Sequence, residues 1–136
     1  MLAIVDTGPL YAVVDADDQD HERCRAVLER ADLELVVPAL VVAEAAYLIG
    51  RRLGPAIEAE FVRGLAALEV EAPRPSDWPE IADLVDRFGD FPLGTTDASV
   101  AALAGRLDTD VIVTLDRRHF AALRAVGGGA FTLLPD

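Results

Sequence analysis

Short apolar runs alternate along the 136-residue chain with longer stretches in which apolar residues recur at helical spacing. A short apolar run that ends at a turn-forming residue is typical of a buried strand, and apolar positions three or four apart predict a helix. The predicted strands are residues 2–5, 33–37, 69–72, 111–115 and 130–134. The predicted helices are residues 9–14, 20–31, 39–53, 55–68, 77–88, 95–107 and 117–124.

The order of these elements predicts the fold class. Strands that alternate with helices favour a mainly parallel sheet with helices on both faces, which is an α/β fold. A chain of this length fits one compact domain, so residues 1–136 are interpreted as a single domain. No internal repeat, low-complexity tract or linker interrupts the pattern.

Composition narrows the class of protein. Hydrophobic residues make up 52% of the chain and charged residues 26%, which excludes a disordered chain. Cys24 is the single cysteine, so no internal disulfide can form and a reducing compartment fits. No signal peptide is visible, and Pro38 and Glu44 break the longest apolar run, residues 35–49. We therefore expect a cytoplasmic protein with no membrane segment.

The charge of the chain bears on its partners. The net charge is −12, and every one of the 12 basic residues is an arginine. A strongly acidic chain departs from the basic surface that is usual for nucleic-acid binding. Binding to a nucleic acid would therefore require cations that offset the local charge, or arginines that gather near the site. Such a surface also suits a basic protein partner.

Two aspartates follow apolar strands directly. Asp6 comes after the strand at residues 2–5, and Asp116 comes after the strand at residues 111–115. In open α/β sheets, ligands bind beyond the carboxyl ends of the strands, so the two carboxylates can converge there. The alternative for each is a helix N-cap, a position that aspartate occupies well.

Two further acids lie on predicted helices. Glu44 is the only charge in the apolar stretch at residues 40–49, so we expect it to be buried. A buried carboxylate needs a metal ion or a partner, and the alternative for Glu44 is pairing with an arginine. Asp97 lies in the first turn of its helix, where an acid is also favourable by itself. Four carboxylates in one pocket stay ionised only around a divalent cation, and oxygen ligands favour Mg²⁺ or Mn²⁺ over zinc.

Four segments in this order resemble the PIN-domain family, and within it the VapC-type toxins of bacterial toxin–antitoxin pairs. They are Val-Asp-Thr-Gly at residues 5–8, Pro-Ala-Leu-Val-Val-Ala-Glu at 38–44, Phe-Pro-Leu-Gly-Thr-Thr-Asp-Ala-Ser at 91–99, and Val-Thr-Leu-Asp-Arg-Arg-His-Phe at 113–120. The resemblance covers essentially the whole chain. It implies a three-layer α/β/α sandwich with a mainly parallel sheet of about four to five strands.

The resemblance also implies an activity and a set of partners. It implies endonucleolytic cleavage of RNA with Mg²⁺ or Mn²⁺, a homodimer, and a VapB-type antitoxin. The metal-site acids of the family fall on Asp6, Glu44, Asp97 and Asp116, and Thr7 falls where the family often has a hydroxyl near the pocket. We assign Asp6 and Asp97 as principal ligands, with Glu44 and Asp116 holding a second ion or orienting the ligands and water.

Hydroxyl and basic side chains are candidates for supporting roles. Thr7, Thr96 or Ser99 could hydrogen-bond to a water or a carboxylate at the site, and the alternative is a cap or turn hydroxyl. His119 is interpreted as a helix-end or surface residue. Arginine matches phosphate groups with two hydrogen bonds, and the alternative is a solvated face. The candidate RNA-binding residues are Arg51, Arg52, Arg87, Arg117 and Arg118.

Three competing functions are compatible with acids on a parallel sheet. Phosphate-accepting receiver domains need a lysine, which this chain lacks. Haloacid-dehalogenase-type phosphatases need Asp-x-Asp after the first strand, and here Gly8 stands at the second position. The third alternative is a PIN-like module that binds RNA or a protein without cleaving, against which the intact set of acids argues.

Overall fold

The computed structural model describes residues 1–125 and 127–136, and within them one parallel sheet forms the centre of the molecule. Its strand order is β3-β2-β1-β4-β5. The strands are β1 (Leu2–Val5), β2 (Glu34–Pro38), β3 (Glu69–Glu71), β4 (Val111–Val113) and β5 (Thr132–Leu134). The helices are α1 (Thr7–Val14), α2 (His21–Leu28), α3 (Ala39–Leu53), α4 (Pro55–Gly64), η1 (Leu65–Ala67), α5 (Asp77–Arg87), α6 (Thr95–Arg106) and α7 (Arg117–Ala122).

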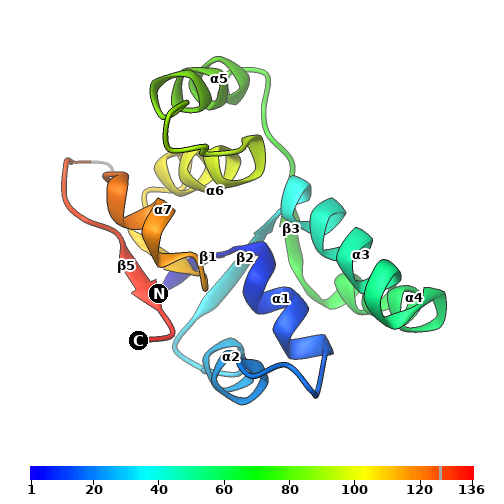
Figure 1. Ribbon diagram of the computed structural model, residues 1–136. Coiled ribbons are helices and arrows are strands. Elements are labelled where there is room, and N and C mark those ends of the chain that lie inside the picture. Colours follow the sequence, from blue (N-terminus) through cyan, green and yellow to red (C-terminus); the bar gives the residue numbers. More distant parts are fainter. Residues whose placement is uncertain (126) are drawn as a thin grey trace.

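The direction of the crossovers places helices on both faces of the sheet. The chain moves outward from β1 to β2 and β3, then returns past β1 to β4 and β5. Because parallel crossovers are right-handed, the reversal moves the connecting helices to the opposite face. Figure 1 shows α5 and α6 on one side of the sheet, with α1 and α2 on the other. The predicted three-layer α/β fold with a parallel sheet is therefore confirmed.

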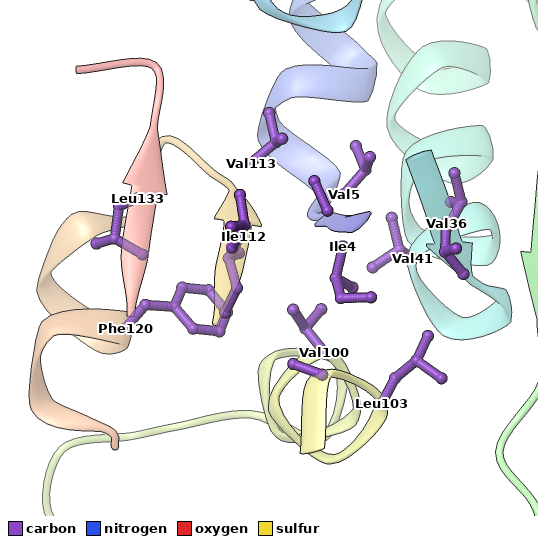
Figure 2. Close-up of a cluster of buried hydrophobic side chains, with 14 of the residues drawn as sticks. Ile4, Val5, Val36, Val41, Val100, Leu103, Ile112, Val113, Phe120 and Leu133 are labelled. Carbon is purple, nitrogen blue, oxygen red and sulfur yellow. The ribbon is translucent and has the colours of Figure 1, made fainter. Parts of the chain in front are cut away.

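The core lies between the sheet and its helices. The three β1 residues Ala3, Ile4 and Val5 are completely buried, as expected for a central strand of an all-parallel sheet. Val100 and Leu103 of α6 pack toward Ile4, and Phe120 of α7 packs toward Ile112 of β4 (Figure 2). Burial of these side chains stabilises the parallel pairing of β1 with β4, so the carboxyl ends of the two strands lie next to each other.

An ion pair ties α5 to α6 and so helps to position α6. Asp77, at the start of α5, accepts hydrogen bonds from Arg106 Nε at 3.0 Å and from the backbone N–H of Arg74 at 2.8 Å. Both side chains of the ion pair are largely buried. Separating the two side chains would leave each charge buried without a counter-charge, which is unfavourable. The ion pair therefore holds α6 against α5.

The predicted elements are present, with different ends. The helix at residues 39–53 has the predicted bounds. The helix predicted over residues 55–68 instead ends at Gly64 and continues as η1, and β4 and β5 are shorter than predicted. Thr114 follows β4 but still donates its N–H to the Leu134 carbonyl at 2.8 Å. Among the described residues, no helix has the length and apolar character needed to cross a membrane.

Candidate functional site

A pocket of about 620 Å³ opens at the carboxyl ends of β1 and β4. This is where the strand order reverses direction, which is the usual position of a ligand site in an open α/β sheet. The four acids that the sequence singles out all line it, each from a different element. Its lining comprises Asp6, Thr7, Gly8, Glu44, Leu48, Gly94, Thr95, Thr96, Asp97, Leu115 and Asp116.

Asp6 lies at the buried floor of the pocket. Its residue is only 4% exposed, and its Oδ2 accepts a hydrogen bond of 2.8 Å from Thr114 Oγ1. Its Oδ1 has no hydrogen-bond partner within the described part of the chain. Burial, followed by the negative charge of Asp97, raises the pKa of Asp6 from 3.8 to about 7, although the Thr114 bond opposes this. Asp6 has no capping hydrogen bond, so it is not an N-cap of α1 in the usual sense.

Asp97 and Asp116 meet at the side of the pocket. Asp97 stands in the first turn of α6, whose amino end favours a negative charge. Burial, followed by the charge of Asp116, raises the pKa of Asp97, and His119 opposes that shift. Asp116 Oδ1 accepts a hydrogen bond of 3.2 Å from the backbone N–H of His119, so Asp116 also caps α7. Asp116 therefore caps the amino end of α7 and also lines the pocket, so both interpretations apply to this residue.

Glu44 reaches the pocket from α3, but it is exposed rather than buried. The expectation of burial was wrong, because only Val41, Ala45 and Ile49 of α3 are fully buried. Glu44 lies on the flank of that stripe and faces the opening. No arginine forms an ion pair with it among residues 1–125 and 127–136, and its charge raises the pKa values of both Asp6 and Asp97.

The three candidate hydroxyls are placed differently. Thr7 lines the pocket, and its buried Oγ1 lacks a partner in the described structure. Thr96 also lines the pocket. Ser99 is outside the lining, and its hydroxyl donates to the Thr96 carbonyl at 2.6 Å, which is the cap or turn role. The structure therefore brings Thr7 and Thr96 to the acids, but not Ser99.

None of the five candidate arginines lines the pocket. Arg118 follows the site residue Asp116 by two positions, and its guanidinium stacks 4.8 Å from the centre of the Phe91 ring. Arg117 turns away and donates to the Pro135 carbonyl at 3.0 Å. Arg51 and Arg52 lie at the end of α3, where they contact Tyr47 and Tyr11 respectively. Arg87 lines a separate pocket with Arg124.

Two residues take part in the site although the sequence analysis did not assign them to it. Thr114 joins two of the acids, because its hydroxyl donates to Asp6 and accepts from the Asp116 N–H at 2.9 Å. His119 lies in the last turn of α7, as the helix-end interpretation expects, but it also contacts the acids, because its Nδ1 lies 2.9 Å from Asp97 Oδ2 and 2.6 Å from Asp116 Oδ2. Both residues lie close to Asp116 in the sequence, since Thr114 precedes it by two positions and His119 follows it by three. This proximity was the signal that could have placed them at the site.

The donor set of the pocket fits a divalent cation. Carboxylate oxygens of Asp6, Glu44, Asp97 and Asp116 share the pocket lining, and no basic side chain contributes to that lining. The unpartnered Asp6 Oδ1 and Thr7 Oγ1 offer buried oxygens that an ion and its water could use. Hard cations such as Mg²⁺ prefer oxygen ligands of this kind. An ion held there would relieve the repulsion between the carboxylates.

Replacing Thr114 with valine is expected to weaken metal binding and folding together. Valine keeps the shape but leaves Asp6 Oδ2 and the Asp116 N–H without their shared partner, which is expected to cost about 1–3 kcal/mol. Loss of a side chain that orients a ligand typically lowers metal affinity about 10–100-fold. Urea unfolding and calorimetric Mn²⁺ titration measure the two effects. Thr114→Ser, which retains the hydroxyl, is the matched control; equal Mn²⁺ affinity in the two variants would contradict this role.

Comparison with known proteins shows to which family the chain is similar. The family model described as PIN domain matches residues 3–126. Ribonuclease VapC26 of Mycobacterium tuberculosis (strain ATCC 25618 / H37Rv) is 40% identical over 134 residues, which is 97% of this chain and 99% of that protein.

Solved structures with low sequence identity share the fold. VapC20 of Mycobacterium tuberculosis, described as a Sarcin-Ricin loop cleaving toxin, has a TM-score of 0.74 at 18% identity, over 81% of this chain and 86% of that one. VapBC2 from Rickettsia felis, bound to a DNA fragment from its promoter, has a TM-score of 0.70 at 13% identity, over 98% of each chain. DNA-bound VapBC from Salmonella typhimurium has a TM-score of 0.69 at 21% identity, over 98% of each chain.

Proposed function

Because the chain belongs to the PIN-domain family, in its VapC branch, we propose that it is a Mg²⁺- or Mn²⁺-dependent endoribonuclease and the toxin of a VapBC-type pair. The observation that carries this proposal is the convergence of Asp6, Glu44, Asp97 and Asp116 on one pocket at the reversal of the strand order. The relative named as a ribonuclease is similar along nearly its whole length, which supports cleavage of RNA.

The four acids have different roles in binding the cations. Asp6 and Asp97 are the principal ligands, and Glu44 and Asp116 hold a second ion or orient the ligands and water. When bound, a divalent ion supplies an activated water and offsets the charge that develops on the phosphoryl group. Thr114 positions Asp6 and Asp116, and the Thr7 hydroxyl can orient a water at the pocket floor.

The substrate approaches a pocket that repels phosphate unless cations are present. Arg118, which follows the site residue Asp116 by two positions, is the best placed of the candidate arginines to contact the RNA backbone. Arg117 and Arg87 are less suited, because Arg117 is bonded to backbone carbonyls and Arg87 lines another pocket. RNA binding would therefore rely on the bound cations more than on a basic surface.

The partners follow from the charge and from the family. A VapB-type antitoxin can inhibit the enzyme by placing a basic side chain in the acidic pocket, and adding it is expected to stop cleavage. We also propose a homodimer, with the exposed apolar residues Tyr47, Ile57, Val62 and Trp78 as candidate contacts. Sedimentation analysis of the purified chain tests the dimer.

We further propose that residues 1–136 form a single PIN domain. The family match covers residues 3–126, and β5 beyond it pairs with β4 in the same sheet. One cooperative unfolding transition for the whole chain is the expected result; two separate transitions would argue against it.

Removal of divalent cations is expected to stop RNA cleavage. A generic single-stranded RNA is incubated with the protein in Mg²⁺, in Mn²⁺ and in excess EDTA, and the products are resolved by gel. Cleavage should fall to background in EDTA and return when Mg²⁺ is added in excess of the chelator, because the activated water depends on the ion. Cleavage that persists in EDTA would contradict metal dependence.

The same assay separates the enzyme from a PIN-like binding module. A module would retain the RNA in a filter-binding or gel-shift measurement without producing fragments in either metal. That result, obtained with folded protein and several RNA sequences, would favour the module over the enzyme.

A further inference from the structure

His119 brings a nitrogen donor to two of the four acids. Its Nδ1 lies 2.9 Å from Asp97 Oδ2 and 2.6 Å from Asp116 Oδ2. Asp97 comes from α6, whereas Asp116 and His119 come from the turn into α7 and from α7 itself. A single imidazole nitrogen therefore sits between carboxylates from two separate elements.

Two contacts hold the imidazole in this orientation. Asp116 Oδ1 caps α7 at the backbone N–H of His119, which fixes the backbone below the ring. The ring itself meets Phe91 edge-on, with 5.1 Å between the ring centres. The side chain is only 20% exposed, so packing restricts its rotamers and holds Nδ1 beside Asp97 and Asp116.

The spacing of the three donor atoms suits a metal ion. One donor atom each from Asp97, Asp116 and His119 lies within 4.8 Å of the others. With bonds of about 2.1 Å, adjacent ligands of an octahedral ion lie about 3.0 Å apart, close to the distances from Nδ1 to the two carboxylates.

An independent feature of the same pocket also points to a ligand. Asp6 is 4% exposed, lines the pocket, and carries an Oδ1 without a hydrogen-bond partner among the described residues. A buried carboxylate oxygen without a donor is costly, and a cation in the pocket would compensate it. Asp97 and Asp116 thus line the same pocket as a buried oxygen that a cation would compensate.

We propose that His119 Nδ1 is a direct ligand of the divalent ion, together with Asp97 and Asp116. This inference rests on the metal site of the proposed function and adds a nitrogen to a set that the sequence suggests is all oxygen. An imidazole raises the preference for transition metals, whereas Mg²⁺ prefers oxygen ligands. The site therefore selects Mn²⁺ over Mg²⁺ more strongly than four carboxylates alone would.

Pulsed electron paramagnetic resonance of bound Mn²⁺ tests the ligand directly. The untagged full-length protein is loaded with Mn²⁺ below one equivalent, and electron spin-echo envelope modulation detects a nitrogen bonded to the ion. The chain has only two histidines, so His21→Asn is a matched control for His119→Asn. The wild type and His21→Asn are expected to show the nitrogen modulation, and His119→Asn is expected to lose it.

Calorimetry gives the second readout. Asparagine can keep a polar atom near the Nδ1 position while removing the imidazole, and His119→Asn is expected to lower the ratio of Mn²⁺ to Mg²⁺ affinity about tenfold. Circular dichroism melting confirms that each variant is folded. If His119→Asn fails to fold, the spectrum of folded His21→Asn decides the question, because His119 is then the remaining histidine.

The outcomes distinguish the inference from the function on which it rests. Mn²⁺ binding without nitrogen modulation in the wild type would overturn the ligand role of His119 and leave the carboxylate site intact. An unchanged affinity ratio in folded His119→Asn would overturn it as well. Absence of any Mn²⁺ binding by the folded wild type would overturn both the inference and the proposed metal-dependent nuclease.

Discussion

Replacing both Asp6 and Asp97 with asparagine is expected to lower RNA cleavage by roughly 10³-fold or more while the protein remains folded. The two side chains are the proposed principal ligands, and a catalytic metal ion contributes several kcal/mol to the transition state. Asparagine is nearly the same size as aspartate but is a neutral and weaker ligand. Initial rates of fragment formation with Mg²⁺, measured on RNA in excess, give the effect.

The double variant should retain its fold because neither carboxylate is needed to neutralise a buried cation. Asp6 is buried with one unpartnered oxygen, and Asp97 lies close to the like charge of Asp116. Removing their charges relieves desolvation and repulsion, the two effects that raise the pKa of each. Circular dichroism spectra and melting curves measure this part of the expectation.

A matched control separates the site from the general effect of charge. Asp17→Asn/Asp83→Asn also removes two carboxylates, but both residues are exposed and lie outside the pocket. This variant is expected to cleave RNA at close to the wild-type rate. Full activity in a folded Asp6→Asn/Asp97→Asn protein would rule out the assignment of the four acids.

The fold could be predicted because its determinants are local. The alternation of apolar runs and helical periodicity gives the parallel sheet, and the strand-end positions of Asp6 and Asp116 follow from it. The sequence does not show the strand order, so it cannot show that β1 and β4 are neighbours. That adjacency is what brings the two aspartates to one pocket.

The parts of the site that the sequence missed depend on the direction of side chains. Residues of α3 are apolar on most sides, yet burial follows only the stripe through Val41 and Ala45, so Glu44 is exposed. Thr114 reads as an ordinary strand residue until β1 places Asp6 beside its hydroxyl. His119 depends on where α6 lies, since its partner Asp97 is 22 residues away in sequence. Such contacts arise from tertiary packing and leave no periodic signal.

The stability of the metal-free protein is expected to fall as the pH rises from about 4 to about 7. The pKa of Asp6 is raised from 3.8 to about 7 in the folded protein, chiefly by burial. Within that window the folded state holds a proton that the unfolded state has lost, so raising the pH favours unfolding. One pKa unit corresponds to about 1.4 kcal/mol, so Asp6 alone can account for roughly 4 kcal/mol.

Asp97 acts in the same direction, because burial and Asp116 raise its pKa too. Asp6 is half ionised at its folded pKa of about 7, so its contribution is complete only about one pH unit higher, where the curve should level off. Urea unfolding in EDTA at a series of pH values measures the free energy of unfolding, and Asp6→Asn is expected to flatten most of the dependence. At pH 8 the variant should therefore be more stable than the wild type.

Two comparisons show whether Asp6 is the cause of the pH dependence. Asp17→Asn removes an exposed carboxylate and is expected to leave the wild-type pH dependence in place. Saturating Mn²⁺ is expected to raise the stability of the wild type most at pH 8, where Asp6 is ionised and the ion replaces the proton as its counter-charge. Equal slopes for the wild type and Asp6→Asn between pH 4 and 7 would show that the charge of Asp6 is already compensated in the folded protein. That result would contradict the unfavourable burial of this charge, which is the reason for expecting a cation in the pocket.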